Sequence, residues 1–125
     1  MNTVEDKRKR IRRIVTETIL EITVVVLAVS FRVAFINGYS MYPTYKDGEI
    51  TIINTWDKKP EVGKIMVYKD ASNRYIIHRV LRVHSNEIEF KGDNNQFIDP
   101  VVNIDRLVGT IVNQRDKVED NNEYK

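Results

Sequence analysis

The chain changes its hydrophobic pattern once, near residue 37. Before that point, residues 14–36 are apolar at sixteen of twenty-three positions and contain no Pro or Gly, which is typical of one long helix. At a rise of about 1.5 Å per residue, this helix would be roughly 35 Å long, enough to cross the hydrocarbon core of a bilayer with some tilt. The pattern therefore predicts a membrane-anchor helix over 14–36.

Charged residues interrupt the apolar pattern on one side of this helix. Glu17, Glu21 and Arg32 fall within about 60° of one another on a helical wheel. Three interpretations are open: a transmembrane helix with these charges near the two interfaces, an amphipathic helix on an anionic membrane surface, and a soluble helix packed on the rest of the chain. The charged stripe is also a candidate contact with a partner helix.

Beyond residue 37 the pattern changes to short runs rich in β-branched residues, separated by Gly, Asn, Asp and Ser. Such runs predict strands joined by tight turns. The expected strands are 49–54, 64–69, 74–83, 87–91 and 107–113. We therefore expect a mainly β fold, with a small β domain over 37–114 preceded by one N-terminal helix and followed by a polar tail over 115–125 that frays.

The net charge of +2 hides an uneven distribution. Residues 1–13 contain six basic and two acidic residues and carry +4, so the remainder carries −2. No aromatic or groove-reading element accompanies this basic arm, which argues against nucleic-acid binding. Beside an apolar helix, an excess of Lys and Arg predicts that the arm stays on the cytoplasmic side of a membrane.

The composition also narrows the chemistry. The chain contains no Cys, which excludes disulfides, thiolate metal sites and cysteine nucleophiles. Its two His residues are too few for a histidine-rich metal centre, and we expect neither a metal nor a cofactor. The groups that a serine hydrolase needs, which are a hydroxyl, an imidazole and a carboxylate, are all present.

The candidate nucleophile is Ser40, in the sequence GYSMYPT at 38–44. Gly38 permits a tight turn before it and Pro43 fixes the backbone after it, which suits a hydroxyl held in one position near backbone amides. An ordinary loop serine would show the same local composition.

The candidate base is His78, which alternation in the predicted strand 74–83 sets on one face between two aliphatic residues. Partial burial there favours the neutral imidazole that a general base requires. The candidate acids are Asp93 and Asp99, six residues apart in the polar loop after strand 87–91. Taken one at a time, these residues could equally be a histidine packed in the sheet and two carboxylates that only stabilise a turn. His84 lies at a turn, and we expect it to be exposed and without a catalytic role.

Taken in order, four segments resemble the conserved boxes of the signal peptidase I family of membrane serine proteases. GYSMYPT at 38–44 resembles its nucleophile box, VGKIMV at 62–67 its next strand box, YIIHRV at 75–80 its base box, and KGDNN at 91–95 with Asp99 its last box. The resemblance extends over about 14–113. The subgroup similar to the endoplasmic-reticulum and archaeal enzymes has histidine at the base position, as His78 is here, where typical bacterial members have lysine.

This resemblance implies a Ser-His-Asp site. Ser40 would attack the scissile carbonyl, His78 would accept its proton, and Asp99 would orient His78, with Asp93 as a supporting or alternative acid. The resemblance also implies a single-pass protein of the cell membrane with its catalytic domain on the extracytoplasmic side. Its partners would be membrane lipid and the signal peptides of exported preproteins, cut after small residues.

One position departs from the family pattern, because Gly38 stands where many relatives carry a serine that helps to hold the oxyanion. The oxyanion would then rest on the Ser40 amide and one further donor, for which Thr44 is a candidate. Two other functions stay open. One is a soluble, self-cleaving repressor-type protease, whose lysine base and DNA-binding helices are not seen here. The other is a non-catalytic, signal-peptidase-like assembly or chaperone factor.

Overall fold

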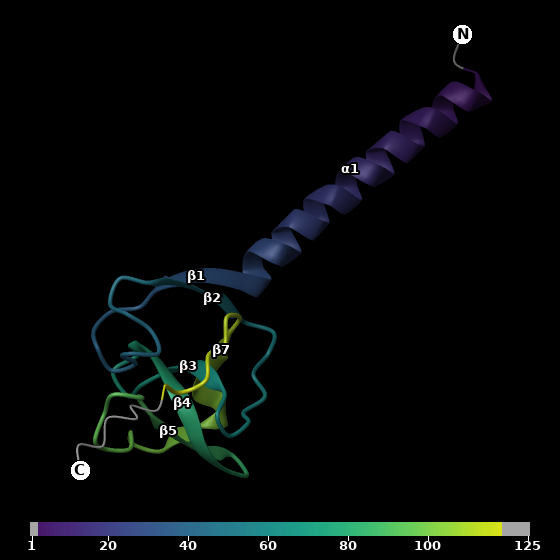
Figure 1. Cartoon of the computed structure of the whole chain (residues 1–125). Coiled ribbons are helices and arrows are strands. Elements are labelled where there is room, and N and C mark those ends of the chain that lie inside the picture. The colour runs from purple at the N-terminus through teal and green to yellow at the C-terminus, as the bar shows by residue number, and fades with distance from the viewer. Residues whose placement is uncertain (1–2, 119–125) are drawn as a thin grey trace. The chain divides into compact units, whose positions relative to one another are not determined.

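The computed structural model describes residues 3–118 and divides the chain into two compact units, Met1–Phe31 and Arg32–Lys125. The first unit is helix α1, Val4–Ser30, drawn in purple and blue in Figure 1. A capping box starts this helix. Oγ1 of Thr3 accepts a hydrogen bond from the Asp6 backbone N–H, and the Asp6 carboxylate accepts one from the Thr3 N–H, each at 3.3 Å. The basic arm from residue 4 onward is therefore part of the helix.

Helix α1 ends at Ser30, before the predicted end at residue 36. The next residues form strand β1, Phe31–Phe35, where aromatic and β-branched side chains favour an extended backbone. The prediction of a single helix over 14–36 is wrong at this end, because the apolar residues after Ser30 are compatible with a strand as well as with a helix.

Because the helix ends earlier than predicted, the prediction of one charged stripe along it also changes. Arg32 lies on β1 and does not share a helical face with Glu17 and Glu21. Glu17 instead pairs with Arg13 one turn earlier on α1, at 2.9 Å. Among residues 3–118, no helix combines the length and the apolar content that crossing a bilayer requires.

The second unit is built on one seven-stranded sheet in the order β1-β2-β7-β3-β4-β5-β6 (Figure 1). All strand pairings from β2 onward are antiparallel, and the prediction of a mainly β fold with one N-terminal helix is confirmed. The strands after β1 are β2 (Ile50–Asn54), β3 (Ile65–Lys69), β4 (Tyr75–His84), β5 (Glu87–Lys91), β6 (Val102–Asn103) and β7 (Leu107–Ile111).

The five predicted strands correspond to β2, β3, β4, β5 and β7 with small differences at their ends. Strands β1 and β6 were not expected from the pattern. Strand β6 has only two residues, too few for alternation to be recognised. Within the predicted polar tail, residues 119–125 lie outside the described part of the chain.

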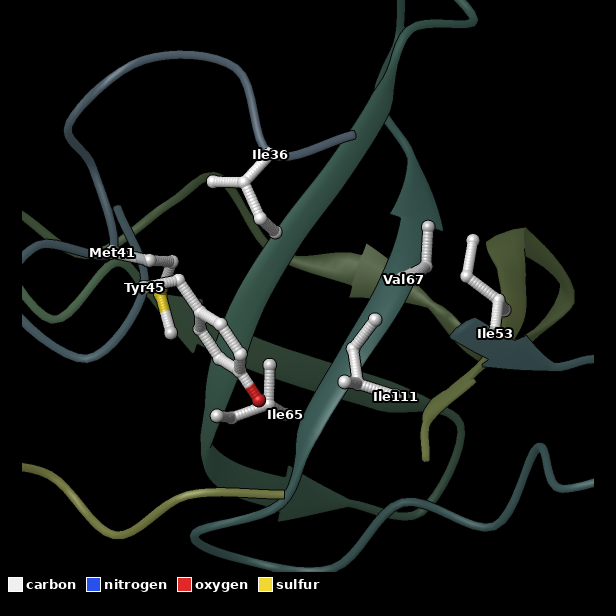
Figure 2. Packing of buried hydrophobic residues seen from close by; sticks show 7 residues of the cluster. All are labelled: Ile36, Met41, Tyr45, Ile53, Ile65, Val67 and Ile111. Atoms are coloured by element: carbon white, nitrogen blue, oxygen red, sulfur yellow. The ribbon is translucent and has the colours of Figure 1, made fainter. Parts of the chain in front are cut away.

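Strand β3 separates two hydrophobic clusters, because its successive side chains point to opposite faces of the sheet. Figure 2 shows the first cluster, in which Met41 and Tyr45 from the loop after Ser40 point in among strand residues. Its members are Ile36, Met41, Tyr45, Ile53, Ile65, Val67 and Ile111. The second cluster contains Tyr68 and Phe90, whose rings stack with their centroids 4.6 Å apart.

Candidate active site

Ser40 lies in a loop held by packing on both sides. Its neighbours Ile36 and Met41 are 5% and 1% exposed. Gly38 has a φ of +91°, in the left-handed region that favours glycine, and its N–H donates to the Asp47 carboxylate at 2.8 Å. The residues around Ser40 are therefore fixed by the core and by a turn that needs glycine.

The loop after β5 contacts the same segment. The backbone N–H of Asn94 donates to the carbonyl oxygen of Ser40 at 2.9 Å. The side-chain amide of Asn94 donates to the carbonyl oxygen of Tyr39 at 3.0 Å. A segment that is far from Ser40 in the sequence thus holds the backbone of the candidate nucleophile in place.

His78 lies on β4 and is 7% exposed. Its Nδ1 is 2.5 Å from Oδ2 of Asp99, and Asp99 is itself anchored by its N–H, which donates to the carbonyl oxygen of Phe90 at 2.8 Å. An imidazole that donates from Nδ1 to a carboxylate presents an unprotonated Nε2. That tautomer is the one a general base needs.

Ser40 and His78 line one small pocket with a volume of about 120 Å³. Apolar side chains from β1, the Ser40 loop and β4 make up much of the rest of its wall, among them Phe35, Met41 and Ile77. A hydroxyl and an imidazole therefore lie on the wall of one pocket, where acyl transfer by a serine and a histidine would need them.

The two candidate acids have different partners. The hydrogen bond to His78 comes from Asp99, whereas Asp93 accepts from Arg79 Nε and Nη2 at 2.9 and 2.8 Å. Burial alone would raise the pKa of the Asp93 carboxyl, but the hydrogen bonds from Arg79 and Thr44 outweigh it and hold this pKa below its ordinary value. The geometry therefore favours Asp99 over Asp93 as the residue that orients His78.

Thr44 does not fit the role of second oxyanion donor. It is 3% exposed, and its hydroxyl donates to Oδ2 of Asp93 at 2.5 Å. A hydroxyl has a single proton to donate. Because Thr44 donates this proton to Asp93, its hydroxyl has none left for an oxyanion.

The remaining histidine lies apart from this chemistry. The side chain of His84 is 61% exposed, and its Nε2 is 3.7 Å from the Glu89 carboxylate. Within residues 3–118, no group of three or more His, Cys, Asp or Glu side chains is arranged to hold a metal ion.

Sequence reasoning misses Tyr68, which belongs to the Asp99 cluster. Its hydroxyl donates to Oδ2 of Asp99 at 2.6 Å. Tyr68 pairs with Ile76 across β3 and β4, two positions from the pairing of Met66 with His78. The signal that could find it is the register of these two strands, which the sequence alone does not provide.

The sequence model of the Peptidase S24-like family matches residues 11–112, a range that contains all four candidate residues. The chain belongs to this family. The match covers residues 11–30 of α1 and all strands from β1 to β7.

Proteins similar to this chain include catalytic subunits of signal peptidase complexes. The signal peptidase complex catalytic subunit SEC11 of Candida dubliniensis is 40% identical over 65 residues, covering 48% of this chain and 39% of the relative. That of Yarrowia lipolytica is 37% identical over 65 residues, covering 48% and 38%. That of Dictyostelium discoideum is 36% identical over 66 residues, covering 48% and 37%.

These relatives confirm the resemblance to signal peptidases that the four sequence boxes indicate. The matched part spans about 39% of the length of the Candida relative.

Proposed function

We propose that this Peptidase S24-like protein is a serine endopeptidase of the signal peptidase type, which removes signal peptides from exported preproteins. The observation that carries the proposal is that Ser40 and His78 line one pocket while His78 is hydrogen-bonded to Asp99. The similarity to catalytic subunits of signal peptidase complexes supports the substrate class.

In the proposed mechanism, the Ser40 hydroxyl attacks the scissile carbonyl carbon while Nε2 of His78 takes its proton. The bond from Oγ to the carbonyl carbon forms, and the imidazolium then passes the proton to the departing amine as the C–N bond breaks. Water hydrolyses the acyl-enzyme with His78 again acting as the base. Asp99 keeps the ring oriented through Nδ1 and stabilises its positive charge.

The oxyanion in this mechanism is held by backbone N–H donors. The amide of Ser40 is the first donor in this proposal. Since the Thr44 hydroxyl donates to Asp93 and Gly38 has no side chain, the second donor in this proposal is a further backbone amide of the same loop.

The small pocket supports a preference for small residues before the cut. At about 120 Å³, with Phe35, Met41 and Ile77 in its wall, it accepts a short apolar side chain more readily than a branched or aromatic one. The acyl part of the substrate would therefore enter beside Ser40 with a small residue directed into this pocket.

We also propose that α1 associates with the membrane, with residues 37–114 on the extracytoplasmic side. Exposed apolar side chains along the C-terminal half of α1, such as Val24, Val25 and Leu27, support this, being 57%, 61% and 54% exposed. The basic residues in the N-terminal part of α1 favour keeping that end of the helix on the cytoplasmic side.

Cleavage of a purified model preprotein by the full chain in detergent and lipid tests the function. We expect a single product pair, cut after a small residue as read by mass spectrometry, and no product with Ser40→Ala. Equal cleavage by the wild type and Ser40→Ala would refute the proposal. Carbonate extraction of membranes tests the anchor separately, since release of the protein into the supernatant would contradict an integral helix.

A further inference from the structure

The Asp99 carboxylate has two hydrogen-bond donors on one oxygen. Oδ2 is 2.5 Å from Nδ1 of His78 and 2.6 Å from the hydroxyl of Tyr68. The Asp99 side chain is 11% exposed and that of His78 is 9% exposed. At this degree of burial, both interactions are stronger than they would be in water.

The position of the Tyr68 hydroxyl is fixed by the sheet. Tyr68 is 4% exposed, and its ring stacks on Phe90 at 4.6 Å with an interplanar angle of 29°. It pairs with Ile76 on β4, the strand that carries His78. The donor and the imidazole therefore reach Asp99 from two adjacent strands that cannot shift independently.

The phenol remains a neutral donor over the working pH range. Burial, followed by the hydrogen bond to Asp99, raises the pKa of Tyr68 far above its ordinary value. Its proton therefore stays on the hydroxyl and is shared with the carboxylate.

Other charged and titratable groups line the larger hollow, of about 740 Å³, that also contains Tyr68, His78 and Asp99. Asp70 and Arg74 form an ion pair at 2.8 Å, and Arg106 donates to the carbonyl oxygens of Lys69 and Asp70. Tyr75 lies on the wall of the smaller pocket. The charged and titratable side chains that line the hollows around the Asp99 cluster are therefore Lys69, Asp70, Arg74 and Arg106 in the larger one and Tyr75 in the smaller one.

We propose that Tyr68 is a positioning residue that sets the basicity of His78 by sharing Oδ2 of Asp99. The proposal rests on the proposed function in that His78 is the base. A donor on Oδ2 withdraws negative charge from the oxygen that faces the imidazole. The imidazolium is then stabilised less by Asp99, and the carboxylate is held in one orientation by the two hydrogen bonds.

The matched test compares Tyr68→Phe with Tyr45→Phe in the full chain. Both changes remove one buried phenol hydroxyl, since the Tyr45 hydroxyl donates to the backbone carbonyl of Asn113, but Tyr45 lies in the other cluster. We expect the NMR titration midpoint of the His78 ring to rise by about 0.5 pH units in Tyr68→Phe and to stay unchanged in Tyr45→Phe.

The same shift is expected in activity. The acid limb of the kcat/KM profile for preprotein cleavage should move to higher pH in Tyr68→Phe, with a loss on the order of threefold below the midpoint that disappears as the pH is raised. A purely structural role would lower the rate equally at every pH. An unchanged midpoint in folded Tyr68→Phe, or an equal shift in Tyr45→Phe, would overturn the proposal.

A second variant keeps the test decisive if Tyr68→Phe does not fold. Replacing Tyr68 by 3-fluorotyrosine retains the ring and makes the hydroxyl a stronger donor, so the His78 midpoint should fall. A midpoint that rises or stays constant would contradict the proposal. The titration requires no cleavage, so it remains informative even if equal activity of Ser40→Ala and the wild type refutes the proposed function.

Discussion

Gly92 lies directly against the carbonyl oxygen of Ser40. A Cβ atom at position 92 would lie 2.6 Å from that oxygen and 2.7 Å from Nδ2 of Asn95, closer than side chains approach backbone in folded proteins. The loop that carries Asp93 and Asp99 therefore reaches the nucleophile loop only because residue 92 has no side chain. This contact sets the separation of the two segments that hold the candidate site.

Gly92→Ala should therefore displace the Ser40 backbone. We expect a loss of about 1–3 kcal/mol in the free energy of unfolding, together with a fall in kcat of about tenfold or more in the folded protein, since small misplacements of reacting groups are costly. Denaturant unfolding and preprotein cleavage below the unfolding transition measure the two effects.

Gly109→Ala is the matched control for this change. A Cβ there would lie 2.4 Å from the carbonyl oxygen of Asn54, between β7 and β2. It should destabilise the sheet while leaving kcat of the folded fraction close to that of the wild type. Equal effects of both variants on kcat would contradict a specific role for the contact between Gly92 and Ser40.

Asp99→Asn should disable the base without removing the imidazole. An amide cannot stabilise the imidazolium and permits the wrong tautomer, so kcat should fall by about 10⁴-fold. Asp105→Asn, at an exposed carboxylate, serves as the control and should cleave at the wild-type rate. Full activity of Asp99→Asn would mean that Asp99 is not the residue that orients His78.

Asp93 should contribute to stability rather than to proton transfer. Its side chain is 3% exposed and pairs with that of Arg79, which is 16% exposed. Asp93→Asn leaves this cation without its carboxylate and should lower the free energy of unfolding at pH 7 by about 3 kcal/mol.

The pH dependence of this effect follows from the lowered pKa of Asp93. A carboxyl whose pKa in the folded state lies below the ordinary 3.8 stabilises the fold at pH values above that ordinary value. The contribution is lost as the pH falls through the folded-state pKa. The difference between wild type and Asp93→Asn in urea unfolding should therefore be largest near pH 7 and shrink below about pH 4. A difference that does not depend on pH would refute this role.

The sequence predicts the strands of the sheet well where a short apolar or alternating run lies between clear turn residues. The predicted strand 87–91 coincides with β5, and 64–69 differs from β3 by one residue. The end of α1 is missed because residues 31–35 continue the apolar run of the helix, and only contacts with the sheet decide between the two conformations.

For the candidate site too, the sequence indicates the residues that local motifs contain but not the contacts between distant parts of the chain. The order of the four boxes singles out Ser40, His78, Asp93 and Asp99, but the choice between the two carboxylates depends on which loop end reaches β4. The pairings of Thr44 with Asp93 and of Tyr68 with Asp99 join residues 49 and 31 positions apart. No local pattern encodes such contacts, since they depend on which distant loops and strands the fold brings together.

The most direct test of the account is a double-mutant cycle between Ser40 and His78, measured as preprotein cleavage by the full chain. His84→Ala is the control, because that histidine is exposed and remote from the pocket. If Ser40 and His78 act as one unit, each alanine variant should lower kcat by about 10⁶-fold and the double variant should be no slower than either. Losses that multiply in the double variant, or cleavage retained by either single variant, would contradict the account.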